Sequence, residues 1–263
     1  MQDLNITLVQ TSLAWEDPDA NLLKFEKLIS SLRRDTDLII LPEMFNTGFT
    51  MSAEKNAELM DGKTIAWLSD MARMNDSVIC GSLIIKEDKK YYNRFIWMRQ
   101  DGSYDHYDKR HLFRMGDEHN HFSAGQSKLI TEIKGWRVMP LICYDLRFPV
   151  WSKNTYVNDS YEYDLLLFVA NWPAVRIDAW NSLIKGRAIE NLAYVAGVNR
   201  TGTDGRGYEY SGGSMVAAPW GEILKEASKG KENIFSIRLQ SSALKEIREK
   251  IGVGKDWDEF EMK

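Results

Sequence analysis

The chain has 263 residues, of which 44% are hydrophobic and 27% are charged, and its formal net charge is -4. This apolar content is enough for a large core, and layered α/β chains of this length fold as single units. A negative net charge argues against a surface for nucleic acid or anionic membranes. No apolar run is long enough to span a bilayer, and no secretory signal is recognisable. We therefore expect a cytoplasmic chain that binds neither nucleic acid nor membrane.

Apolar runs of strand length alternate with segments that have helical spacing. The predicted strands are, in chain order, 4–10, 38–41, 78–85, 92–98, 103–107, 129–133, 136–142, 165–170, 194–198, 215–217, 223–226 and 233–237. The predicted helices are 21–34, 64–74, 180–192 and 243–251, and residues 116–125 are predicted to form a loop. This alternation, with no internal repeat and no obvious linker, predicts one α/β (α+β layered) domain over residues 1–263.

Cys143 lies in the most informative stretch of the chain. The apolar run 138–142 predicts a buried strand that stops at this cysteine, and Pro149 suits the first turn of a following helix. A thiol between a strand end and a helix start can be exposed and ionised, and the helix amides favour its reactive thiolate form. A buried structural role is the commoner one for a cysteine taken alone. Cys80 fits that role, and we expect no disulfide between the two cysteines.

Two other segments place an ionisable residue just after a predicted strand. Glu43 follows the apolar run 38–41, and Lys109 follows the predicted strand 103–107. Taken singly, such an acid is usually a helix cap and such a lysine is usually solvated. Because Glu, Lys and Cys all occur in this setting, the three together predict a catalytic group built around a thiol.

The histidines allow two other arrangements. A Cys–His pair is a common device of thiol hydrolases, and His111 is the candidate partner, although it also suits a bracing role in the lysine loop. His119 and His121, with Asp117 or Glu118, have the residue types of a metal site, but no further cluster completes a ligand set. We therefore expect no metal and no organic cofactor.

The sequence resembles the nitrilase, or carbon–nitrogen hydrolase, superfamily from residue 4 to about residue 237. The segments that carry the resemblance are Leu41-Pro42-Glu43, Lys109-Arg110-His111-Leu112, Glu118 ahead of Phe122 and Gly125, and Cys143-Tyr144-Asp145-Leu146-Arg147-Phe148-Pro149. The resemblance implies a four-layer αββα sandwich and a homodimer formed through the face near the cysteine.

The same residues suit amide hydrolysis. Cys143 can attack the amide and form a thioester with release of ammonia, while Glu43 moves the protons and later activates water. Lys109 and the backbone N–H of Tyr144 can stabilise the tetrahedral oxyanion. Glu118 can hold Lys109 charged and in place, or orient the substrate amide.

A narrower resemblance, to the bacterial omega-amidases or 2-oxoglutaramate amidases, is carried by residues 43–45, 108–115, 117–119 and 170–173. Arg147, four positions after the cysteine, is placed to bind a carboxylate through two hydrogen bonds. Asn171, Trp172 and Arg176 follow another strand end and are candidates for the rest of the pocket, with core packing as the alternative for Trp172.

The expected substrate is a small amide, 2-oxoglutaramate or 2-oxosuccinamate, hydrolysed to the 2-oxo diacid and ammonia. Two alternatives remain open on the sequence. Another amidase or a carbamoylase on the same scaffold, for example a deaminated-glutathione amidase, would use the same three catalytic residues. A non-catalytic thiol sensor would need only the cysteine.

Overall fold

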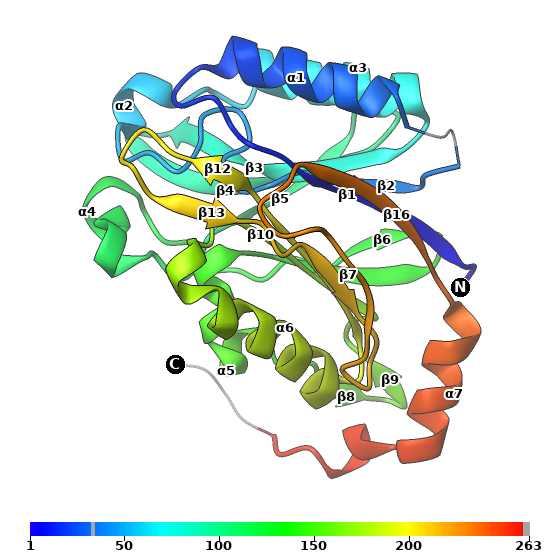
Figure 1. Cartoon of the computed structure of the whole chain (residues 1–263). Coiled ribbons are helices and arrows are strands. Elements are labelled where there is room, and N and C mark those ends of the chain that lie inside the picture. The colour runs from blue at the N-terminus through cyan, green and yellow to red at the C-terminus, as the bar shows by residue number, and fades with distance from the viewer. Residues whose placement is uncertain (33–34, 260–263) are drawn as a thin grey trace.

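The computed structural model describes residues 1–32 and 35–259, which form a four-layer αββα sandwich with two six-stranded sheets face to face (Figure 1). The strands of the first sheet, in spatial order, are β16 (Asn233–Leu239), β1 (Leu4–Gln10), β2 (Leu38–Ile40), β3 (Val78–Glu87), β4 (Lys90–Met98) and β5 (Tyr104–Asp108). Those of the second are β15 (Ile223–Glu226), β14 (Met215–Ala217), β11 (Tyr194–Asn199), β10 (Leu165–Ala170), β7 (Trp136–Ile142) and β6 (Thr131–Ile133). The expected architecture is confirmed.

Helices, 3-10 turns and two small hairpins make up the other regular elements of the described residues. The helices are α1 (Pro18–Ser30), α2 (Ala53–Asn56), α3 (Lys63–Asn75), α4 (Glu118–His121), α5 (Pro149–Ser152), α6 (Ile177–Asn191) and α7 (Ser241–Ile251). The 3-10 turns are η1 (Arg114–Gly116), η2 (Cys143–Arg147), η3 (Ala174–Arg176) and η4 (Val253–Asp256). Two hairpins pair β8 (Tyr156–Val157) with β9 (Ser160–Tyr161) and β12 (Thr201–Thr203) with β13 (Glu209–Ser211). Over residues 1–32 and 35–259, no helix has the length and apolarity needed to cross a membrane.

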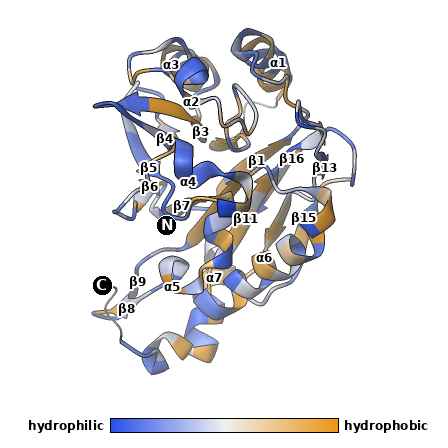
Figure 2. Ribbon diagram, turned by 90° about the vertical axis from the view of Figure 1, so that its left-hand side faces the viewer, coloured by the Kyte–Doolittle hydropathy of each residue, from blue (hydrophilic) through white to orange (hydrophobic). Residues whose placement is uncertain are grey.

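Each sheet has a parallel centre that is buried on both faces. Strands β1, β2 and β3 run parallel, as do β7, β10 and β11. Helices α1 and α3 cover the outer face of the first sheet, and α6 covers that of the second (Figure 1). Strands covered on both faces are predominantly apolar, which explains the hydrophobic runs of the sequence (Figure 2).

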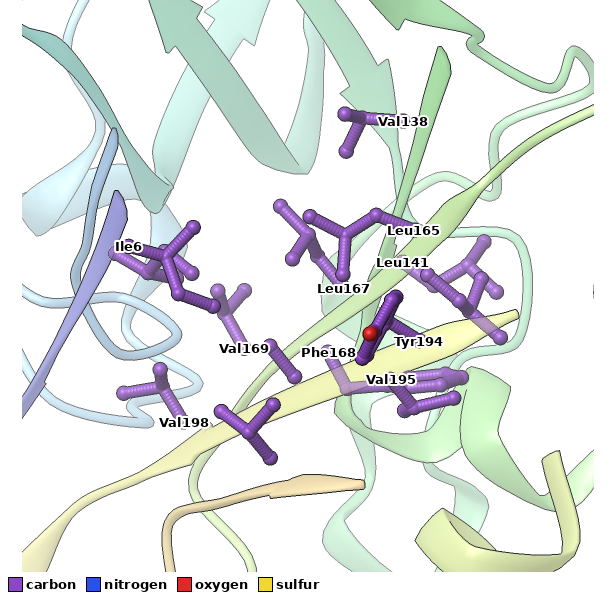
Figure 3. Close-up of a cluster of buried hydrophobic side chains, with 14 of the residues drawn as sticks. Ile6, Val138, Leu141, Leu165, Leu167, Phe168, Val169, Tyr194, Val195 and Val198 are labelled. Atoms are coloured by element: carbon purple, nitrogen blue, oxygen red, sulfur yellow. The ribbon is translucent and has the colours of Figure 1, made fainter. Parts of the chain in front are cut away.

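The main core lies between the sheets. Ile6 of β1 faces the second sheet, where Leu165, Leu167 and Val169 of β10 point to the same side (Figure 3). Phe168 points to the opposite side, because successive side chains of a strand alternate between its faces. The packing between the two sheets fixes how their strand ends meet.

The structure corrects several predicted boundaries. The first helix begins at Pro18, where the Asp17 side chain caps it, and ends at Ser30 rather than continuing; residues 33 and 34 of the predicted helix lie outside the described residues. The predicted loop 116–125 is wrong in part, because Glu118–His121 form the single turn α4. The strand predicted over 129–133 is shorter, beginning at Thr131.

Candidate active site

The polar residues that follow the buried strands meet at one edge of the sandwich. Strand β4 is antiparallel to β3, and β5 is antiparallel to β4, so β5 runs in the same direction as β2. Glu43 after β2 and Lys109 after β5 therefore lie at the same edge of the first sheet. Cys143 after β7 and Asn171 after β10 lie at the facing edge of the second sheet.

Lys109 joins the two glutamates. Its Nζ lies 2.8 Å from Oε1 of Glu43 and 3.0 and 2.9 Å from the two carboxylate oxygens of Glu118. All three side chains are fully buried. Burial lowers the pKa of Lys109, but the two carboxylates outweigh it and raise that pKa above its usual range, so the amine is an ammonium.

Glu118 has the contacts of an ionised carboxylate. Burial raises its pKa above the usual value, Lys109 offsets this only in part, and the Glu43 carboxylate adds to the rise. Besides the two contacts with Lys109, its oxygens accept hydrogen bonds from the backbone N–H of Phe113 at 2.6 Å and from Nδ2 of Asn93 at 3.2 Å. Because every partner is a donor, we assign the charged form to Glu118.

Two asparagines fix the Glu43 carboxylate. Nδ2 of Asn93 donates to Oε1 at 2.8 Å, and the backbone N–H of Asn171 donates to Oε2 at 2.8 Å. The side chain of Asn171 also donates to the backbone oxygen of Glu43 at 2.6 Å. These contacts fix the carboxylate beside Cys143, close enough for its negative charge to raise the pKa of the thiol.

Cys143 is held in a strained backbone conformation. Its φ is +44°, in the left-handed region that costs a residue with a side chain roughly 1–3 kcal/mol. It opens the 3-10 turn η2, so the backbone N–H of Tyr144, in the first turn, has no acceptor within that turn. Pro149 does begin a helix, α5, but η2 separates that helix from the cysteine.

The predicted exposed thiolate is wrong for this state of the protein. Cys143 is only 8% exposed. Burial raises the pKa of its thiol well above the usual range, the Glu43 carboxylate raises it further, and Lys109 only partly offsets the two. The sequence showed neither the burial nor the adjacent glutamate. The thiol is thus neutral with a base beside it.

Asp145 ties the cysteine turn to the lysine loop. Its buried carboxylate accepts hydrogen bonds from the Tyr107 hydroxyl at 2.8 Å and the Ile142 backbone N–H at 3.0 Å. It also bonds the backbone N–H and Nδ1 of His111, at 3.0 and 2.8 Å. The His111 ring stacks on Phe148 at 3.7 Å between ring centroids. His111 therefore braces the loop, and its Nδ1 is occupied by Asp145 rather than by the thiol.

A cavity of about 90 Å³ opens above Cys143. At about 10–15 Å³ per water-sized group, this volume suits a small organic molecule. Its lining includes Tyr144, Asn171 and Trp172 together with the cationic side chains of Arg147, Arg176 and Arg206. The structure thus brings every predicted binding residue to one cavity, while Glu43, Lys109 and Glu118 lie buried behind the cysteine.

Sequence reasoning missed three contributors to the site. Asn93 lies in β4, which also contains Lys90 and Arg94, so its polar character did not single it out; its backbone oxygen accepts the backbone N–H of Lys109 at 3.0 Å. Asp145 was visible in the cysteine segment but had no assigned role. Arg206 lies in a polar, glycine-rich stretch with no strand-like pattern, so no sequence signal pointed to it.

The candidate metal residues do not assemble into a site. Nε2 of His121 bonds the Asp117 carboxylate at 3.1 Å on the surface, and Glu118 is turned inward to Lys109. Among residues 1–32 and 35–259, no group of three or more His, Cys, Asp or Glu side chains is arranged to hold a metal ion.

A buried Cys–Glu–Lys group at the edge of an αββα sandwich defines a hydrolase of carbon–nitrogen bonds. The carbon-nitrogen hydrolase family model matches residues 5–249, and the chain belongs to this family. It is 45% identical to the omega-amidase YafV of Escherichia coli strain K12, with all of both chains covered. It is 33% identical to the 2-oxoglutaramate amidase of Bacillus subtilis, covering 95% of this chain and 96% of that one.

A solved structure extends the match to three dimensions. A CN-hydrolase superfamily protein of Xanthomonas campestris, with an arsenic adduct in its active site, is 42% identical over the whole of both chains, with a TM-score of 0.98. The predicted family and fold are therefore confirmed, and the chain is a hydrolase acting on amides.

Proposed function

We propose that this protein is an omega-amidase that hydrolyses the terminal amide of 2-oxoglutaramate or 2-oxosuccinamate through a thioester on Cys143. The observation that carries the proposal is the position of the Glu43–Lys109–Glu118 cluster behind a thiol whose cavity is lined by three arginines. The cluster suits amide chemistry, and the arginines suit an acid at the other end of the substrate. The names of the relatives at 45% and 33% identity support the same substrate class.

In the first half-reaction the thiol of Cys143 gives its proton to Glu43, and its sulfur attacks the amide carbon. The resulting oxyanion is stabilised by Lys109 and by the backbone N–H of Tyr144. Of the three N–H bonds of Lys109, one is directed at Glu43 and one lies between the two oxygens of Glu118, which leaves one for the oxyanion. Removing one such donor typically costs about 3–4 kcal/mol of transition-state stabilisation.

Glu43 then passes the proton to the nitrogen, the carbon–nitrogen bond breaks, and ammonia leaves a thioester. In the second half-reaction Glu43 takes a proton from water, the hydroxide attacks the thioester, and the proton returns to the sulfur as the acid leaves. Each proton-transfer role is worth roughly 10²–10⁴-fold in rate. No step calls for a metal or a cofactor.

The test is ammonia release from a panel of amides. 2-Oxoglutaramate and 2-oxosuccinamate should be hydrolysed, an uncharged amide of similar length should be poor, and a carbamoyl amino acid should be inert. The Cys143→Ala variant, checked for folding by circular dichroism, is the blank. A preference for the uncharged amide or for the carbamoyl compound would refute the proposed substrate class.

We also propose that residues 1–263 act as one domain, that two copies pair near the cysteine turn, and that the protein works in the cytoplasm. The shared core of the two sheets supports one domain. The exposed Val150 beside η2 supports the pairing, and two free cysteines suit a reducing compartment. Light scattering at the monomer mass, or recovery of the protein in a secreted fraction, would contradict the last two points.

A further inference from the structure

Three arginines and a single carboxylate, that of Asp204, line the cavity above Cys143. Arg147 belongs to η2, Arg176 to η3, and Arg206 to the turn between β12 and β13. None of the three forms an ion pair with any residue in the part of the chain that the structure describes. Three unpaired cations around one small cavity create a strong local attraction for anions.

All three arginines lie over aromatic rings, and the guanidinium carbon of Arg206 is 6.0 Å from the ring centroid of Tyr208. The guanidinium carbon of Arg147 is 5.0 Å from the ring centroid of Trp172, and that of Arg176 is 5.2 Å from the ring centroid of Phe113. The indole N–H of Trp172 donates to the backbone oxygen of Arg176 at 2.8 Å, which links the two supports. A guanidinium stacked on a ring keeps its N–H edges free for a planar anion.

Arg206 projects from a turn that Asp204 organises. One oxygen of the Asp204 carboxylate accepts the backbone N–H groups of Arg206 and Tyr208, both at 2.9 Å, and the other accepts the Tyr210 hydroxyl at 2.9 Å. The guanidinium carbon of the buried Arg200 lies 4.7 Å from the ring centroid of Tyr210. The turn is thus held in place before any ligand binds.

These contacts also occupy Asp204. Although it lines the cavity, both of its oxygens already accept hydrogen bonds from its own turn. A positively charged group on a ligand would therefore meet three guanidinium groups and no free carboxylate. The cavity wall attracts acceptors and repels cations.

We propose that Arg206 is a specificity-determining residue that selects a 2-oxo acid over the corresponding 2-amino acid at the end of the substrate remote from the amide. The inference deepens the proposed function and rests on it. A carboxylate and its adjacent 2-oxo group present acceptors in one plane, which Arg147 and Arg206 can meet from two sides. Glutamine presents an ammonium at the position of the oxo group, and the unpaired cations exclude it through repulsion.

The test compares three five-carbon amides that differ only at carbon 2: 2-oxoglutaramate, the unsubstituted monoamide of glutaric acid, and L-glutamine. Arg206→Gln should lower kcat/KM for 2-oxoglutaramate by about tenfold or more, mainly through KM, because it removes a hydrogen bond to a charged donor. The loss on the unsubstituted monoamide should be markedly smaller. Arg206→Glu should raise the rate with glutamine relative to 2-oxoglutaramate.

The matched control is Arg73→Gln, because Arg73 is an exposed arginine on the outer helix α3. It removes the same charge far from the cavity and should leave all three rates unchanged. Equal losses on the 2-oxo and unsubstituted amides, or no loss on either, would overturn the assignment of Arg206.

Binding separates a failure of this inference from a failure of the proposed function. If the unaltered protein does not turn over 2-oxoglutaramate, the proposed function is wrong, and calorimetry with 2-oxoglutarate on the Cys143→Ala protein still tests Arg206. Adding Arg206→Gln should weaken that binding by about tenfold and weaken glutarate less. An unchanged dissociation constant, or equal weakening of both diacids, would overturn the inference.

Discussion

The ammonium of Lys109 contacts both carboxylate oxygens of Glu118, at 3.0 and 2.9 Å, and neither side chain is reached by solvent. A buried amine tends to lose its proton, so this pair and the contact with Glu43 are what keep Lys109 charged. The candidate oxyanion donor therefore depends on a residue that need not touch the substrate.

Replacing Glu118 should accordingly impair catalysis through Lys109. Glu118→Gln keeps the shape but removes one of the two charges that hold the ammonium, and we expect kcat to fall by about 10²-fold or more. A fall in kcat with little change in KM, measured at constant folded fraction, is the expected signature. Activity equal to that of the unaltered protein would show that Glu43 alone suffices to hold Lys109.

The two cysteines provide a matched pair of variants. Cys143→Ala should abolish ammonia release with little effect on thermal stability. Cys80 is fully buried in the core between the sheets. The variant Cys80→Ala should therefore have a lower melting temperature and a nearly unchanged kcat. Loss of activity in Cys80→Ala without a loss of folded protein would contradict this division of roles.

The pH dependence of labelling tests the state of the thiol. Because burial and Glu43 raise the pKa of Cys143, the thiolate fraction is small at neutral pH and rises only in alkaline solution. Labelling by iodoacetamide should therefore still increase with pH above about 9. A plateau reached below neutral pH would indicate a preformed thiolate–ammonium pair instead. In Glu43→Gln the neighbouring negative charge is gone, so labelling should shift toward lower pH while amide hydrolysis is lost.

Arg147 should act on the acid end of the substrate. Arg147→Ala is expected to raise KM for carboxylate-bearing amides by about tenfold or more, because it removes a charge-assisted contact. Its effect on an uncharged amide should be small, and Trp172→Phe, which keeps an aromatic support, should be milder than Trp172→Ala. Equal losses on charged and uncharged amides would refute a carboxylate-binding role.

The hydrogen bonds to Asp145 should contribute measurably to the stability of the fold. Asp145→Ala leaves the Tyr107 hydroxyl and two backbone N–H groups without their buried acceptor, so we expect the free energy of unfolding to fall by about 3 kcal/mol. Chemical denaturation measures this value. Tyr107→Phe removes only one of the bonds and should cost about 1 kcal/mol. Similar costs for the two variants would argue against Asp145 as the shared acceptor.

Much of the fold could be predicted because its strands are buried on both faces. The continuous apolar run of β10 and the largely apolar run of β1 allowed both strands to be predicted with the bounds that the structure shows. The hairpin of β12 and β13 could not be found in this way, because its short polar strands lack any alternation. Arg206 was missed with it, since its place in the cavity depends on how distant segments pack.

The candidate site, like the fold, could be predicted from the sequence only in part. Strand ends followed by Glu43, Lys109 and Cys143 predicted a group that the structure does bring together. The ionisation state of Cys143 was mispredicted, because it depends on burial and on the approach of Glu43 from the other sheet. Neither the burial of Cys143 nor its contact with Glu43 can be inferred from the spacing of residues in the sequence.

In the proposed reaction, Cys143 forms a thioester with the acyl part of the substrate. The most direct measurement is mass spectrometry of the protein quenched in acid during turnover of 2-oxoglutaramate, followed by peptide mapping. We expect a peptide containing Cys143 whose mass is increased by that of the substrate less ammonia, and no such adduct on Cys80. Ammonia release that continues in Cys143→Ala, with no adduct on any cysteine of the unaltered protein, would contradict it.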